Sequence, residues 1–157
     1  MKKMLFLSGG LIVLAILLSG CTQQSSQADV EKCNDLPEIE SKMQCKYELF
    51  SKQELSFCDS LSAENDKYYC YSSIAMAKKD KELCNLLDNE NWVNTYQNSC
   101  IAGVAEATKD SQLCIEITDE IPRDMCYLAV ATAKKDAKIC DLIVKSDIKG
   151  KCVENTA

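Results

Sequence analysis

The chain has 157 residues and a formal net charge of −6, with no histidine, five glycines and two prolines. The absence of histidine removes the commonest general base and metal ligand. Five glycines are too few for a glycine-rich phosphate-binding loop. An acidic chain without a basic stripe does not fit a nucleic-acid-binding protein. A sequence poor in helix breakers and rich in alanine, leucine, lysine and glutamate favours α-helix.

The first twenty residues have the pattern of a secretory signal peptide. Lys2 and Lys3 give a positive start, and residues 4–18 form an apolar run interrupted by one serine and two glycines. This pattern is typical of a segment removed on export rather than of a folded element. The 17 residues between Lys3 and Cys21 are at the lower limit for a membrane-spanning helix, so an uncleaved anchor is the weaker alternative.

The signal region ends in Leu18-Ser19-Gly20-Cys21, which resembles the lipobox of prokaryotic lipoproteins at all four positions. The resemblance implies a diacylglyceryl group on the Cys21 thiol and cleavage that leaves Cys21 as the first mature residue. It also implies an exported protein held by lipid on the outer face of a prokaryotic membrane, in the cell envelope. A plain signal peptide with a chance cysteine is the alternative.

The number of cysteines fits lipid on Cys21. The chain has 11 cysteines, and an odd number in an exported protein needs an explanation. If Cys21 carries lipid, the remaining ten can all pair, as expected in an oxidising compartment. We therefore expect a signal peptide over residues 1–20, a lipidated cysteine with a polar, flexible tether over 21–29, and a folded domain over 30–157.

A ten-residue motif recurs in the domain as AMAKKDKELC, AEATKDSQLC and ATAKKDAKIC, ending at Cys84, Cys114 and Cys140. Together with Cys33 and Cys58, these cysteines are separated by 25, 26, 30 and 26 residues. Each has an acidic residue four positions before it and a leucine or isoleucine three positions after it. This self-similarity predicts five repeat units, near residues 29–53, 54–79, 80–109, 110–135 and 136–157.

Each unit is predicted to be a pair of helices, because a second cysteine follows in every unit: Cys45, Cys70, Cys100, Cys126 and Cys152. Positions four and seven residues after the middle three of these cysteines are aliphatic or alanine and share one helical face. We expect a short helix capped by the acidic residue and a longer helix whose last turn contains the lysines. The predicted fold class is all-α, with five disulfide-stapled helical hairpins stacked as a short α-solenoid.

Two sequential disulfide schemes are available. Pairing across the repeated motif gives Cys45–Cys58, Cys70–Cys84, Cys100–Cys114 and Cys126–Cys140. It leaves Cys33 and Cys152 unpaired and would offset Cys70 from Cys84 by roughly 9 Å along the helices, more than a disulfide spans. Pairing within units uses all ten cysteines and joins residues at one level of a hairpin, which favours Cys33–Cys45, Cys58–Cys70, Cys84–Cys100, Cys114–Cys126 and Cys140–Cys152.

The third unit has 16 residues of separation between its cysteines, whereas the other units have 12. The four extra residues are about one helical turn, so the insertion predicts a longer helix that carries Trp92 and Tyr96 on one face. Trp92 either fills the core or acts as an exposed aromatic anchor for a ligand. Tyr68 and Tyr69 are further candidate binding residues, because at least one tyrosine beside Cys70 must face away from the core.

No catalytic constellation is found in the sequence. The Cys-x-x-Cys motif of a thiol oxidoreductase does not occur, and the paired carboxylates are typical of solvated faces. We therefore expect no enzyme activity, no cofactor and no metal. The predicted function is a lipid-anchored cell-surface scaffold that binds a protein or peptide along its helices. A structural envelope spacer without a specific ligand is the alternative, followed by a thiol-redox or metal-storing protein.

Overall fold

The computed structural model describes residues 26–87 and 93–157, and the regular elements in these ranges are all helices. In chain order they are α1 (Gln27–Asn34), α2 (Ile39–Phe50), α3 (Leu55–Ser60), α4 (Glu64–Lys78), η1 (Lys81–Leu87), α5 (Val93–Thr108), η2 (Ser111–Glu116), α6 (Glu120–Lys134), η3 (Ala137–Leu142) and α7 (Ser146–Thr156). The all-α prediction is confirmed. The predicted signal peptide, the lipidation site Cys21 and Trp92 lie outside the described residues.

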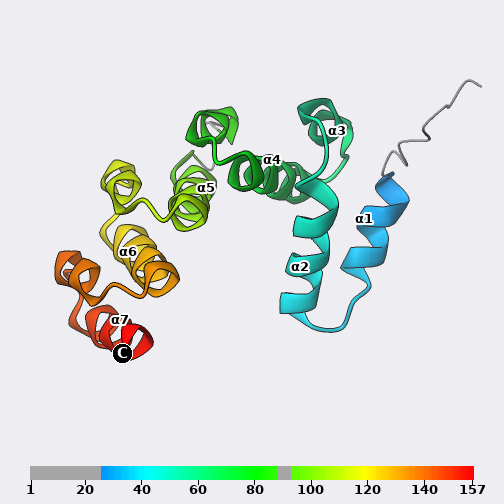
Figure 1. Ribbon diagram of the computed structural model, residues 1–157. Coiled ribbons are helices and arrows are strands. Elements are labelled where there is room, and N and C mark those ends of the chain that lie inside the picture. The colour runs from blue at the N-terminus through cyan, green and yellow to red at the C-terminus, as the bar shows by residue number, and fades with distance from the viewer. Residues whose placement is uncertain (1–25, 88–92) are drawn as a thin grey trace, which may run out of the picture.

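Each repeat unit is a hairpin of a shorter and a longer helix. The pairs are α1 with α2, α3 with α4, η1 with α5, η2 with α6 and η3 with α7. Figure 1 shows the five hairpins following one another along an arch, with the longer helices on its inner side and the shorter ones outside. The stacked hairpins form the short α-solenoid that the repeat predicts.

The repeated motif forms the joint between one unit and the next. At the end of α6, the Lys135 N–H donates to the Thr132 carbonyl at 3.2 Å and the Asp136 N–H donates to the Ala131 carbonyl at 3.0 Å. This is a Schellman arrangement, which satisfies carbonyls that the helix end leaves free. The residue after the helix adopts a left-handed backbone with φ of 56°, 58° and 54° in Lys79, Lys109 and Lys135. The lysine directly before the aspartate of each motif therefore lies just beyond the last helical turn, whereas the prediction placed it within that turn.

The aspartate of the motif caps the short helix that follows, as predicted, in the last three units. Its side-chain oxygen accepts the N–H two residues further on, at 2.9 Å from Asp110 to Gln112 and 3.1 Å from Asp136 to Lys138. These short segments are 3-10 helices, the tighter form that is common in short connecting pieces.

The first unit has a different N-cap from the one predicted, and the second has the predicted N-cap residue without its side-chain bond. Ser26 is the N-cap of α1, and Asp29 lies inside that helix as its capping-box partner. Glu54 stands at the N-cap of α3 without a side-chain hydrogen bond to the helix. Residues 27–29 of the predicted tether consequently belong to α1.

Disulfides and aliphatic side chains make up the core. Four of the five residues that lie three positions after the first cysteine are buried, namely Leu61, Leu87, Ile117 and Ile143. The equivalent Leu36 is half-buried. Both buried clusters of the described residues and all five disulfides lie within residues 30–157.

Buried polar side chains link neighbouring units. The Asp124 carboxylate in α6 accepts the N–H groups of Val144 and Lys145, the latter at 2.8 Å, at the start of α7. One unit earlier, Asn98 occupies the same position relative to its cysteine and donates to Asp119 at the start of α6, at 3.2 Å. These bonds fix the level at which each long helix meets the next.

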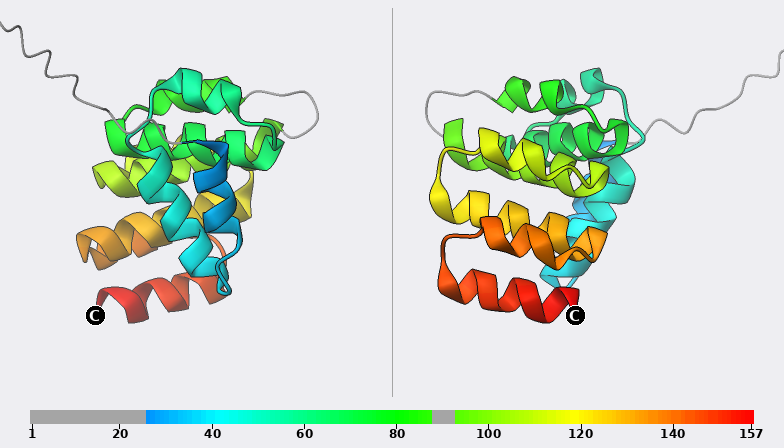
Figure 2. Two further views of the ribbon diagram at one scale, coloured as in Figure 1. Left: turned by 90° about the vertical axis from the view of Figure 1, so that its right-hand side faces the viewer. Right: turned by 60° about the vertical axis from the view of Figure 1, so that its left-hand side comes forward.

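The first hairpin meets the second in a different way. Figure 2 shows α4, α5, α6 and α7 side by side, whereas α2 runs across them. The Lys46 Nζ and the Asp66 carboxylate form a buried ion pair at 2.6 Å between α2 and α4. Among the described helices, none lies against one face of α2 as a result of this crossing.

The extra residues of the third unit are mostly outside the described ranges. The described α5 has 16 residues, and α4 and α6 have 15 each. The additional helical turn predicted there would fall on residues 88–92, outside the described residues. Within the described ranges, no helix combines the length and the apolar character needed to cross a membrane.

Candidate functional site

The structure contains the five within-unit disulfides. Their Cα–Cα distances are 5.5 to 5.7 Å, in Cys33–Cys45, Cys58–Cys70, Cys84–Cys100, Cys114–Cys126 and Cys140–Cys152. Cysteines in disulfides have no thiolate to bind a metal or attack a substrate. A search of residues 26–87 and 93–157 also finds no group of three or more metal-binding side chains.

Tyr68 is buried, which corrects its assignment as a surface binding residue. Its ring stacks on Tyr96 with centroids 4.2 Å apart, and its hydroxyl donates to Glu64 at 2.7 Å. The Tyr96 hydroxyl donates to Asn65 at 2.7 Å. The two rings therefore tie α4 to α5, and their stacked faces are closed to a ligand.

Tyr69 is exposed, which agrees with the expectation that at least one tyrosine beside Cys70 faces away from the core. The Lys46 Nζ lies 5.5 Å from the centroid of its ring, within reach of a cation–π contact. Tyr71, two residues further on, donates its hydroxyl to Asp59, and burial together with that carboxylate raises the Tyr71 pKa to about 12. Tyr69 is thus the predicted binding residue that the structure places at the surface.

An exposed apolar stripe runs along α2. Ile39, Met43 and Tyr47 are 72%, 48% and 37% exposed, and their spacing of four places them on one line of the helix. Cys45 bonds α2 to α1, and Lys46 contacts α4, so the stripe lies outside both contacts. The spacing is visible in the sequence, but the same pattern is typical of a face that packs into a core.

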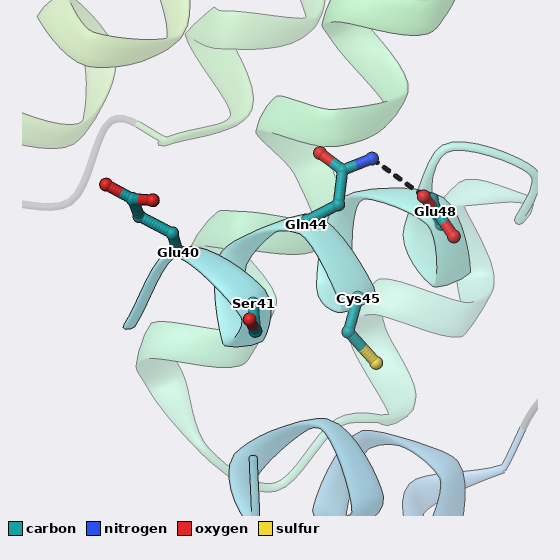
Figure 3. Close-up of a pocket in the computed structure, with 5 residues that line it drawn as sticks. All are labelled: Glu40, Ser41, Gln44, Cys45 and Glu48. Carbon is teal, nitrogen blue, oxygen red and sulfur yellow. Dashed lines mark hydrogen bonds between the residues drawn. The ribbon is translucent and has the colours of Figure 1, made fainter. Parts of the chain in front are cut away.

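A shallow hollow lies beside the stripe. It is lined by Glu40, Ser41, Gln44, Cys45 and Glu48. Figure 3 shows Glu40, Gln44 and Glu48 projecting from one side of α2, with Cys45 on the opposite side, and Gln44 donates a hydrogen bond to Glu48 at 2.7 Å. The hollow offers acidic and amide groups, and these can accept hydrogen bonds from a basic ligand.

The acidic side chains along the hollow are not neutralised by nearby lysines in the part of the chain that is described. Neither Glu40 nor Glu48 belongs to an ion pair there. Of the two lysines of α2, Lys46 is held by Asp66, and Lys42 lies on the edge of the stripe opposite the two glutamates. The candidate site is therefore a surface with an apolar centre and an acidic edge. We call it the α2 face, and it comprises Ile39, Glu40, Met43, Gln44, Tyr47 and Glu48.

Comparison of the chain with models of protein families, with curated proteins and with solved structures found no match. The chemistry of the α2 face and the signal region are therefore what bear on function.

Proposed function

We propose that this protein is a lipid-anchored cell-surface scaffold that binds a protein or peptide on its first hairpin. The observation that carries the binding function is the exposed apolar stripe of Ile39, Met43 and Tyr47 beside a hollow. Single exposed apolar side chains are ordinary, but a contiguous apolar patch with a polar rim marks an interaction site. Tyr69, beside Lys46 at one border of α2, extends the available surface.

The anchoring part of the proposal rests on the lipobox-like ending of the signal region at Cys21. The disulfides support it, because such bonds persist in the oxidising compartments outside the cytoplasm. The domain begins at Gln27, close behind Cys21. A short tether of this kind keeps the first hairpin, and with it the α2 face, near the membrane surface.

The alternatives have weaker support. A spacer without a ligand needs rigidity, which the stapled hairpins supply, but it needs no exposed apolar stripe on α2. A thiol-redox or metal-storing role needs free thiols, whereas ten cysteines form disulfides. The binding scaffold accounts for both the staples and the stripe.

A selection without bias towards any chemistry tests the binding function. The disulfide-bonded protein without its signal peptide and Cys21, residues 22–157, is immobilised and offered a random peptide library displayed on phage. We expect enrichment of related sequences whose binding is lost when Met43 and Tyr47 are both replaced by serine. Failure to enrich any sequence above the background of the blank support would contradict the proposal.

A further inference from the structure

We infer that the α2 face takes a basic amphipathic helix of a partner protein. This inference rests on the proposed binding function and names the chemistry of the partner. The partner helix places apolar side chains on Ile39, Met43 and Tyr47 and lysine or arginine side chains next to Glu40 and Glu48.

The geometry of the stripe matches a helix. Eight residues separate Ile39 from Tyr47, which is about 12 Å along the helix axis. Two turns of a partner helix cover that length, with anchors at the three- and four-residue spacings used in helix-in-groove recognition. The N–H groups of α2 donate within the helix from Lys42 onward, so a ligand along the stripe is recognised through side chains and not by addition of a strand.

The carboxylates beside the stripe favour a positively charged partner. Glu40, Gln44 and Glu48 each follow a stripe residue by one position, so they form a row along one edge of the stripe. The hairpin of α1 and α2, residues 27–50, contains six acidic residues and three lysines. Of these lysines, Lys32 pairs with Asp29 and Lys46 pairs with Asp66. Lys42 borders the stripe on the edge opposite the acidic row, so the favourable side for a positive charge is the edge of Glu40 and Glu48. A cationic helix therefore meets complementary charge, which guides its approach and its orientation.

Two other occupants fit the charges less well. Anionic lipid would be repelled by the acidic row. In a second copy of the chain, antiparallel pairing of two α2 stripes would oppose Glu40 of one molecule to Glu48 of the other, and like charges at such a contact are unfavourable. Both occupants are separated from a basic helix in the test below.

The test uses two synthetic helical peptides of equal length. One has leucine on one face and lysine on the other, and the second has glutamate in place of every lysine. Binding of each fluorescent peptide to the same disulfide-bonded protein, residues 22–157, is measured by anisotropy at two salt concentrations. We expect the lysine peptide to bind and to bind more weakly at high salt, and the glutamate peptide not to bind.

Variants then locate the site. The double substitution Met43→Ser and Tyr47→Ser should weaken binding of the lysine peptide about tenfold or more, because buried anchors dominate such interfaces. The matched control replaces Ile121 and Met125, which have the same spacing on α6 and are 58% and 49% exposed, by serine. The control should bind the peptide like the original protein.

Charge reversal gives an independent test. Glu40→Lys with Glu48→Lys should weaken the lysine peptide and create binding of the glutamate peptide, whereas Glu154→Lys on α7 should do neither. Equal binding by the serine variants of α2 and α6 would overturn the inference. The inference would also be overturned if the protein formed a dimer, or bound phosphatidylglycerol vesicles, and the Met43→Ser, Tyr47→Ser variant lost that property. Selected phage peptides that bind the α2 face but are not basic would overturn the inference and leave the proposed function standing, whereas peptides that bind elsewhere would overturn both.

Discussion

Asp124 illustrates how one side chain sets the contact between two repeat units. Its carboxylate is fully buried and accepts the N–H groups of Val144 and Lys145. Hydrogen bonds to a charged group contribute about 1.5–3 kcal/mol each, and a buried charge without them is costly. The contact between α6 and α7 therefore depends on this residue.

We predict that Asp124→Asn lowers the free energy of unfolding by about 2–3 kcal/mol. The substitution removes the charge to which both N–H groups donate, and it puts a buried NH2 donor in place of one of the two accepting oxygens. Denaturant titration of the disulfide-bonded protein measures the change. Glu154→Gln, an exposed substitution on α7, is the control and should change stability by less than about 0.5 kcal/mol. Equal stability of the two variants would show that Asp124 does not hold α7.

The backbone is strained at the residue that follows α4, α5 and α6. Lys79, Lys109 and Lys135 all have a left-handed backbone, which costs a residue with a Cβ atom roughly 1–2 kcal/mol. The Schellman bonds at each helix end offset part of this cost. Glycine is the residue that usually occupies such a position.

Replacement of Lys134 and of Lys135 by glycine should consequently change the free energy of unfolding in opposite directions. We predict that Lys135→Gly raises the free energy of unfolding by about 1 kcal/mol, because it relieves the left-handed backbone. Lys134→Gly, within the last turn of α6, should lower it by about 1 kcal/mol. Denaturant titration gives both values. The same sign for both substitutions would contradict the assignment of the helix end.

The cap of α1 should depend on pH. Hydrogen bonds from Lys32 and from Ser26 hold the Asp29 pKa at about 2, below its ordinary 3.8. Because the folded pKa is the lower one, the stabilisation is complete above about pH 4 and is lost as the pH falls towards 2. Carbon-detected NMR titration of the Asp29 carboxyl should show a midpoint near 2. A midpoint near 4 would mean that the capping box does not form.

At the level of elements, the sequence was sufficient where local chemistry determines the structure. Helical content, the hairpins and the disulfide pairs follow from composition and from cysteines twelve residues apart, or sixteen in the third unit. The left-handed Lys135 could not be predicted, because lysine is rare at positive φ and only the fixed contact with the next unit enforces it. The choice of 3-10 over α-helix after Asp136 depends on the same joint.

The candidate site was less predictable, because it depends on how whole units are arranged. The stripe of Ile39, Met43 and Tyr47 has the spacing of a core face, and only the crossing of α2 over its neighbours leaves it exposed. That crossing is accompanied by the Lys46–Asp66 pair, whose partners are twenty residues apart. Tyr68 and Tyr69 were indistinguishable by sequence, and their opposite burial follows from the packing of α4 on α5.

For the whole molecule, attachment to the membrane is proposed to depend on Cys21. We predict that Cys21→Ala yields a precursor that keeps its signal region, has a higher mass than the processed protein and takes up no labelled fatty acid. The physical reason is that the thiol is the acceptor for the lipid. Metabolic labelling and mass spectrometry of whole cells measure both properties. Equal labelling of the variant and the original protein would remove the lipid anchor from the account.

The closed hairpin is the central feature of the molecule, because it both stabilises short helices and sets how units stack. Each closed loop stabilises by roughly 2–3 kcal/mol, mainly through the unfolded chain. Cleavage after lysine without reduction tests directly whether a hairpin is closed by its own disulfide, because Lys81, Lys109 and Lys134 lie between the units. Cys84 and Cys100 then fall in one peptide, residues 82–109, and Cys114 and Cys126 in another, residues 110–134.

Mass spectrometry should find these two peptides as separate species, each lighter than its reduced form by one molecule of hydrogen. That result means that the third and fourth units are each closed by their own disulfide. A single species in which residues 82–109 are joined to residues 110–134 through Cys100 and Cys114 would contradict it. The staples would then connect successive units, and the hairpins would be held by packing alone.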